Sequence, residues 1–192
     1  MSGPRYAVPF RRRREGKTDF RSRRKMLYSG KPRFVVRKSL CYVWAQVTVT
    51  GKNGDEILVS AHSKELSNYG WKGSFSNTPA SYLTGYLCGL RANKLGISDA
   101  ILDMGLYDVV KGSKIFACLK GFADGDVDIP FDESIVPSED RISGQHIVTY
   151  YEGLDEEERA KRFSKYIKND VVVNDLPDLF SKTKKEIGEK ER

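Results

Sequence analysis

The chain has 192 residues, 39% of them hydrophobic and 31% charged, with a formal net charge of +7. This length suits one domain with extensions. No run of 18 apolar residues and no apolar run after the N-terminal arginines is present, so we expect neither a membrane span nor a secretory signal. The charge is unevenly divided. The first 38 residues hold fourteen Lys or Arg and two acidic residues, a net of +12, so the other 154 sum to −5.

Residues 1–31 are predicted to form a basic arm. Dense like charge and little apolar surface favour disorder in the free chain. Residues 18–28 are expected to become helical on binding, with Thr18 or Asp19 as the N-cap. Interleaved aromatic residues such as Phe20 and Tyr28 suit stacking on unpaired bases. The arm lacks a helical apolar face, which argues against a membrane-surface helix.

The basic residues of the arm, and those of the segment that follows it, are candidate phosphate contacts, because the arginine fork binds phosphate bidentately. A solubilising tail and a nuclear import signal are the alternatives to nucleic-acid binding. The candidate RNA-binding residues are Arg11, Arg12, Arg13, Arg14, Lys17, Arg21, Arg23, Arg24, Lys25, Arg33, Arg37 and Lys38.

Residues 33–62 are predicted to form a three-stranded antiparallel meander. Residues 33–38 read as a strand, and residues 41–50 alternate between apolar and polar types with period two. Asn53-Gly54 is a strong hairpin signal, and residues 56–62 return. One face carries Cys41, Val43, Ala45, Val47, Val49, Ile57, Val59 and Ala61. Tyr42 and Trp44 lie on the other face, where we expect a helix to cover them.

Helices and one further strand follow. A helix is predicted to begin with Thr78 as its N-cap and to end at Gly96. Residues 100–107 are a buried-strand candidate, and Gly112-Ser113 opens a second helix. This order predicts an α/β fold: a mixed sheet, made of the antiparallel meander plus a further strand, covered by helices.

The C-terminal third is predicted to be less regular. An acidic loop covers residues 124–140, a helix covers residues 155–168, and a weakly anchored last helix covers residues 175–190. The expected organisation is a basic extended N-terminal arm at 1–31, an α/β core at 32–153 and a helical C-terminal extension at 154–192.

No constellation of catalytic residues is evident. The two histidines have no metal-ligand neighbours, and we expect no metal, no cofactor and no enzymatic activity. Cys41, Cys88 and Cys118 are expected to be reduced, buried thiols of a cytosolic protein. A nucleotide-handling α/β enzyme stays the runner-up hypothesis, with Asp103 or Asp108 as its acidic residue.

A glycine-flanked loop offers a second basic-aromatic element. It contains Trp71 and Lys72. An exposed Trp71 could stack on a base, or it could plug the core, and the sequence leaves both interpretations open.

The chain resembles the large-ribosomal-subunit proteins that bind 5S rRNA, the "protein eighteen" family of bacteria and archaea, whose eukaryotic counterpart is "protein five". The resemblance covers roughly residues 5–170, and the length and acidic second half are similar to the archaeal type. The segments that carry it are Lys31–Ser39, Asn77–Leu87 with Arg91-Ala92, Gly112–Gly121, Asp128–Pro130, Arg141–Gly144 and Ile147–Tyr151.

The resemblance implies a structural, non-enzymatic role in the cytoplasmic ribosome. The family's arm and adjoining strand surface hold 5S rRNA and help attach it to the large rRNA in the central protuberance. The implied partners are both RNAs and neighbouring large-subunit proteins, including the other 5S rRNA-binding protein. The role carries over to the basic residues named above and to Trp71 and Lys72. A general RNA-binding or chaperone module is the other alternative.

Overall fold

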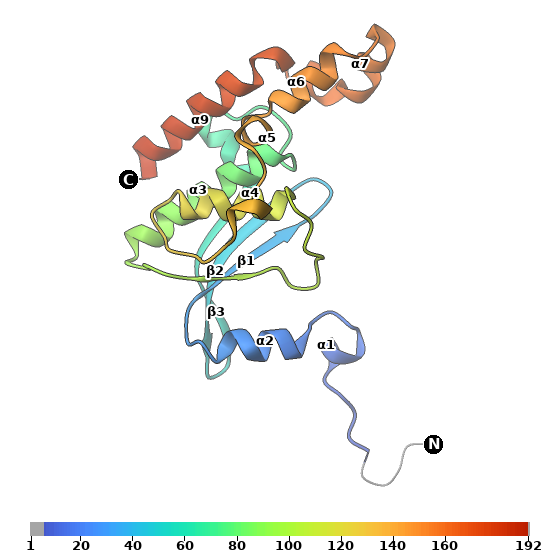
Figure 1. Ribbon diagram of the computed structural model, residues 1–192. Helices are drawn as coiled ribbons and strands as arrows, with labels where there is room; N and C mark the ends of the chain where they lie inside the picture. The colour runs from blue at the N-terminus through green and yellow to red at the C-terminus, as the bar shows by residue number, and fades with distance from the viewer. Residues whose placement is uncertain (1–5, 192) are drawn as a thin grey trace.

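The computed structural model describes residues 6–191. Residues 1–5 of the predicted arm and Arg192 of the predicted extension lie outside this range. Figure 1 shows layers: helices on one face of a sheet, and the basic arm below the other face.

A four-stranded mixed sheet forms the centre, in the order β3-β2-β1-β4. The meander consists of β1 (Arg33–Lys38), β2 (Val43–Gly51) and β3 (Gly54–His62), which pair antiparallel. The fourth strand, β4 (Ile101–Asp103), pairs parallel with β1. The predicted α/β class and mixed sheet are confirmed, although the strand expected over residues 100–107 is only three residues long.

A β-bulge decides which side chains of β3 face the helices. The register shifts between Val47 and Thr48, which pair with Val59 and Ile57 respectively. Leu58 is the extra residue, so Val59 stays buried while Ile57 turns to the opposite face and is 55% exposed. The prediction that Ile57 shares a face with Val59 is therefore wrong, because strict alternation cannot anticipate a bulge.

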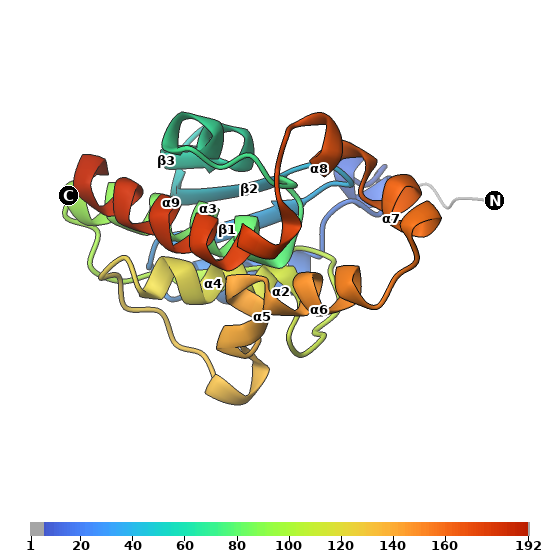
Figure 2. The same ribbon diagram turned by 90° about the horizontal axis from the view of Figure 1, so that it is seen from above.

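Helices α3 (Thr78–Lys94) and α4 (Lys114–Ala123) cover the face of the sheet opposite the arm, and α9 (Leu176–Glu191) packs on the outside of α3. The N-cap of α3 is Asn77 rather than Thr78: the Asn77 side chain accepts a hydrogen bond from the Ala80 amide at 2.9 Å. Figure 2 shows α9 lying along α3. Leu176 and Ile187 of α9 are fully buried, so the last helix is well anchored, contrary to expectation.

Shorter helices complete the chain. The helix predicted over residues 155–168 is two helices that break at Phe163, and the structure adds a helix that we did not expect over residues 145–152. Cys88 and Cys118 are buried as predicted, whereas Cys41 is exposed. The remaining elements are α1 (Arg11–Arg14), α2 (Phe20–Leu27), η1 (Ser63–Tyr69), η2 (Glu133–Ile135), α5 (Glu139–Ser143), α6 (Gln145–Glu152), α7 (Glu156–Arg162), α8 (Ser164–Lys168) and η3 (Val173–Asp175).

Glycines let α3 and α4 touch backbone to backbone. A Cβ built on Gly85 would lie 1.9 Å from the carbonyl oxygen of Cys118, and one on Gly121 would lie 2.1 Å from that of Tyr82. No side chain fits at either position. This close approach places α4 over β1, where Phe122 stacks on Phe34 with ring centroids 3.9 Å apart.

Gly85→Ala should lower the free energy of unfolding by about 3 kcal/mol, because the added methyl group must push the two helix backbones apart. Thermal and chemical denaturation measure the change. Gly153→Ala is the matched control: nothing lies within 3.7 Å of the added Cβ, so this variant should stay within about 0.5 kcal/mol of wild type. Equal stability of the two variants would contradict the backbone contact.

Candidate nucleic-acid interface

The arm contains the predicted helix. Asp19 is the N-cap of α2: its carboxylate accepts hydrogen bonds from the Arg21 amide at 2.9 Å and the Ser22 amide at 3.2 Å. The Ser22 hydroxyl donates a further one, and these bonds hold the pKa of Asp19 below its usual value. The structure thus shows the helix expected within the arm, and this helix lies below the open face of the sheet (Figure 1).

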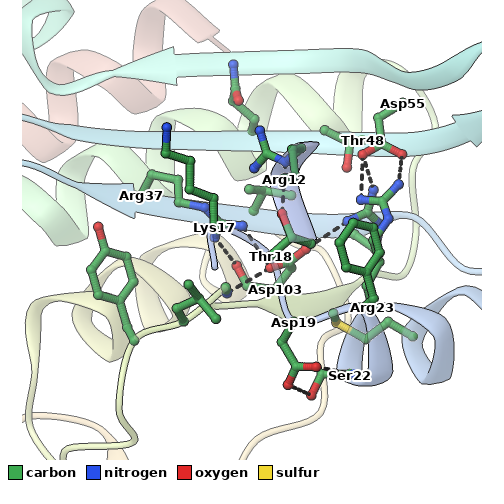
Figure 3. A pocket seen from close by; sticks show the side chains of 18 of the residues that line it. Arg12, Lys17, Thr18, Asp19, Ser22, Arg23, Arg37, Thr48, Asp55 and Asp103 are labelled. Atoms are coloured by element: carbon green, nitrogen blue, oxygen red, sulfur yellow. Dashed lines mark hydrogen bonds and ion pairs between the residues drawn. The ribbon is translucent and has the colours of Figure 1, made fainter. Parts of the chain in front are cut away.

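Alternating arginines and aspartates join α2 to the sheet. We call this set, Arg23, Asp55, Arg33, Asp103 and Arg37, the ion-pair chain. The two Nη atoms of Arg23 lie 2.8 and 2.7 Å from the carboxylate oxygens of Asp55. Arg33 bridges the two aspartates, with an Nη atom 2.7 Å from an oxygen of each. Arg37 Nη2 lies 2.9 Å from Asp103. Figure 3 shows Arg23 beside Asp55 and Arg37 beside Asp103.

The burial of Arg33 explains why the ion-pair chain needs both carboxylates. Arg33 is only 2% exposed, and a buried cation without a counterion is strongly unfavourable. The hydrogen bond from Arg23 and the charge of Arg33 hold the pKa of Asp55 well below its usual range, although burial opposes them. Burial would likewise raise the pKa of Asp103, but Arg37, the Gly105 amide and Arg33 outweigh it and lower that pKa. Both aspartates are thus anionic at neutral pH.

The ion-pair chain removes some predicted residues from direct phosphate contact. Arg33 is buried, and Arg23 and Arg37 are half-buried and paired with carboxylates. The predicted cations that remain exposed are Arg11, Arg12, Arg13, Arg14, Lys17, Arg21, Arg24, Lys25, Lys38 and Lys72.

A cavity of about 790 Å³, lined by both charged and apolar side chains, lies between the arm and the sheet (Figure 3). Arg12 and Lys17 line it from the arm, and Thr48 and Asp103 line it from the sheet. Arg12 donates to the Thr18 hydroxyl at 2.8 Å and Lys17 pairs with Glu15 at 2.9 Å, so both cations are held by the arm itself. The concave surface combines positive charge with hydrogen-bonding groups.

Trp71 belongs to the core. It is 1% exposed, and its indole N–H donates to the Ser74 carbonyl at 3.1 Å. Of the two interpretations, the structure favours the core plug, and Trp71 presents no face to a base. The neighbouring Lys72 is exposed and lines a second cavity of about 270 Å³.

Sequence reasoning missed an exposed aromatic residue. Trp44 lies on the open face of the sheet, 42% exposed, with its ring centroid 4.4 Å from that of His62. The alternation of β2 predicts that face correctly, but the helix expected to cover it is absent there, because α2 lies over the Arg33 end of the sheet instead. An indole on an exposed sheet can stack on an unpaired base.

The geometry offers little to an enzyme. Asp103, the acidic residue of the runner-up hypothesis, is engaged by two arginines and cannot act as a base near neutral pH. Within residues 6–191, no three His, Cys, Asp or Glu side chains gather as a metal site would require. No helix in the same range is both long and apolar enough to cross a bilayer.

Comparison with known proteins identifies the family. Residues 4–100 match the family model described as ribosomal large subunit proteins 60S L5 and 50S L18. The large ribosomal subunit protein uL18 of Methanothermobacter thermautotrophicus is 56% identical over 187 residues, which cover 97% of both chains. That of Methanobrevibacter smithii is 51% identical over 189 residues, 98% of both.

The chain belongs to this family of large-subunit ribosomal proteins. The predicted resemblance is confirmed. This ribosomal protein is a structural constituent of the large subunit rather than an enzyme, and its place is the ribosome in the cytoplasm.

Asp103→Asn should destabilise this ribosomal protein by about 3–5 kcal/mol at pH 7, because it leaves the buried Arg33 with one carboxylate. The folded-state pKa of Asp103 lies below its usual value of 3.8, so its stabilisation is present above pH 3.8 and is lost as the pH falls through that lowered pKa. Unfolding free energies of both proteins, measured from pH 7 downward, should therefore converge in acid.

Asp108→Asn is the control for this titration, because Asp108 is exposed and the same charge is removed. It should match wild type within about 0.5 kcal/mol at every pH. A loss at Asp108 equal to that at Asp103 would contradict the importance of the buried pair.

Proposed function

We propose that this protein binds 5S rRNA through its basic arm and the adjoining open face of the sheet. In doing so it helps attach 5S rRNA to the large rRNA in the central protuberance, beside neighbouring large-subunit proteins that include the other 5S rRNA-binding protein. The observation that carries the proposal is the exposed positive charge of a helix already docked beside a concave, polar sheet face. Membership of the family supports an RNA ligand.

Two features of the open face support RNA over a protein ligand. The exposed cations are mostly arginine, whose planar fork suits phosphate. Trp44 offers a stacking surface on the same face.

Two alternatives make different predictions. A general RNA-binding or chaperone module would bind unrelated RNA as tightly as 5S rRNA. A nucleotide-handling enzyme would need an acidic residue free to act as base, and the pairing of Asp103 with two arginines disfavours it.

The double variant Arg21→Gln/Lys25→Gln should weaken 5S rRNA binding and make it less dependent on salt. Both residues are exposed on α2, and each lost phosphate contact should reduce the log–log slope of affinity against salt by roughly 0.7–0.9. Filter binding or fluorescence anisotropy across a salt series measures both effects, with unrelated RNA of equal length as competitor.

Lys182→Gln/Lys185→Gln is the matched control. It removes the same charge from exposed positions of α9, on the opposite side of the molecule from the arm (Figure 1). Its slope should equal that of wild type. Equal losses in the two double variants, or equal competition by unrelated RNA, would overturn the proposal.

Trp44→Ala should weaken 5S rRNA binding by about 1–3 kcal/mol if the indole stacks on a base, with the salt slope unchanged because no charge is removed. The residue is 42% exposed, so the fold should persist, and circular dichroism checks this. Leu95→Ala, an exposed apolar residue at the end of α3, should leave affinity unchanged. Unaltered binding by Trp44→Ala would remove the sheet aromatic from the interface.

A further inference from the structure

Two ion pairs join the arm to the body in the part of the chain that the structure describes, Arg23–Asp55 and Lys31–Asp99. Lys31 directly precedes Pro32 and β1, so its pair fixes the entry of the strand rather than the helix. Arg23 is therefore the residue that ties α2 to the sheet through a bidentate contact with Asp55.

Asp55 is itself held from inside the fold. Arg33 lies 2.7 Å from one of its oxygens and is 2% exposed, and the Thr50 hydroxyl is 3.3 Å from the other. Arg33 is in turn fixed by Asp103. The carboxylate that receives Arg23 is thus held by contacts within the body that do not involve the arm, and a partner held in place in this way lowers the entropy lost on docking.

Helical geometry then determines which way the other basic side chains of α2 point. At 100° per residue, Arg21 and Lys25 lie about 160° around the helix from Arg23, on a shared i,i+4 face. Turning Arg23 toward Asp55 consequently turns Arg21 and Lys25 away from the sheet, and both are exposed. The pair determines not only where α2 lies but also which of its faces is presented.

We propose that Asp55 is a positioning residue for RNA binding: this carboxylate holds α2 on the sheet so that the opposite, cationic face of the helix meets the RNA backbone. The inference rests on the proposed function and deepens it. The proposal predicts the opposite of what net charge alone would predict. Removing a negative charge from a protein that binds a polyanion should strengthen binding, whereas here it weakens binding because the helix must be ordered when the RNA arrives.

The test compares Asp55→Asn with Glu56→Gln in the full chain. The two residues are neighbours at exposed positions of β3 and lose the same charge, but Glu56 points to the other face of the strand, away from Arg23 and Arg33. Asp55→Asn should bind 5S rRNA roughly fivefold more weakly than wild type, the low end of ordinary coupling between two sites. Glu56→Gln should bind as tightly as wild type or slightly more tightly, and Asp55→Glu should recover part of the loss.

A measurement without RNA separates the positioning role from the proposed function. Hydrogen exchange of the α2 amides should quicken in Asp55→Asn and in Arg23→Gln, but not in Glu56→Gln. Arg23→Gln loosens the helix without altering the sheet, so it excludes misfolding of the body as the cause.

The outcomes are distinct. Unchanged α2 exchange in Asp55→Asn, or 5S rRNA affinity equal to that of Glu56→Gln, overturns the positioning role. Failure of wild type to bind 5S rRNA overturns the proposed function, and the role of Asp55 in RNA binding falls with it, while exchange still reports whether Asp55 holds the helix.

Discussion

A guanidinium buried between two carboxylates organises the open face of this protein. Arg33 stands at the start of β1 and is almost inaccessible, so its charge requires Asp55 from the β2–β3 hairpin and Asp103 from β4. These aspartates come from segments 48 residues apart in sequence, and one cation brings them together on a single face. β4 makes only three backbone pairings with β1, and the Asp103 ion pairs add to them. The arm pairs with one of these carboxylates, Asp55, so the arm and the sheet are joined through the same group of charges.

The opposite face of the sheet is held by apolar packing rather than by ion pairs. There the sheet packs against α3, which is buried along most of its length between the strands, α4 and α9. Small residues at Gly85 and Gly121 allow the helix backbones to meet, and apolar packing fills the rest. Because α3 and α4 occupy this face, the other face is left to α2 and to charged and aromatic side chains.

The structure shows how the basic arm and the acidic body contact each other. The arm is strongly positive and the body is negative, yet the relevant contacts are local. Asp55 neutralises one arginine of α2 and leaves Arg21 and Lys25 exposed. An acidic residue beside a polyanion-binding surface is thus consistent with binding when it fixes a basic helix in place, since a helix that is already ordered loses less entropy on binding.

Local patterns were sufficient for much of the fold. The bounds of β1, the hairpin after β2, the helix capped by Asp19 and the helix after Ser113 follow from residue spacing and from turn and cap chemistry within a few residues. The candidate interface was predictable as a stretch of positive charge for the same reason, because net charge is a property of the sequence.

Which of those charges are free was decided by tertiary structure. Arg33 and Arg21 are both arginines of one basic segment and look equivalent in the sequence. Arg33 is buried and paired with residues 22 and 70 positions away, whereas Arg21 is exposed. The exposure of Trp44, the burial of Trp71 and the rotation of Ile57 at the bulge likewise depend on which distant segments lie on each face. The sequence by itself determined the meander, the helices α2, α3 and α4, and the sign of the charge. Only the packing of segments far apart in the chain decided which side chains the elements present, because burial and ion pairing are properties of neighbours in space.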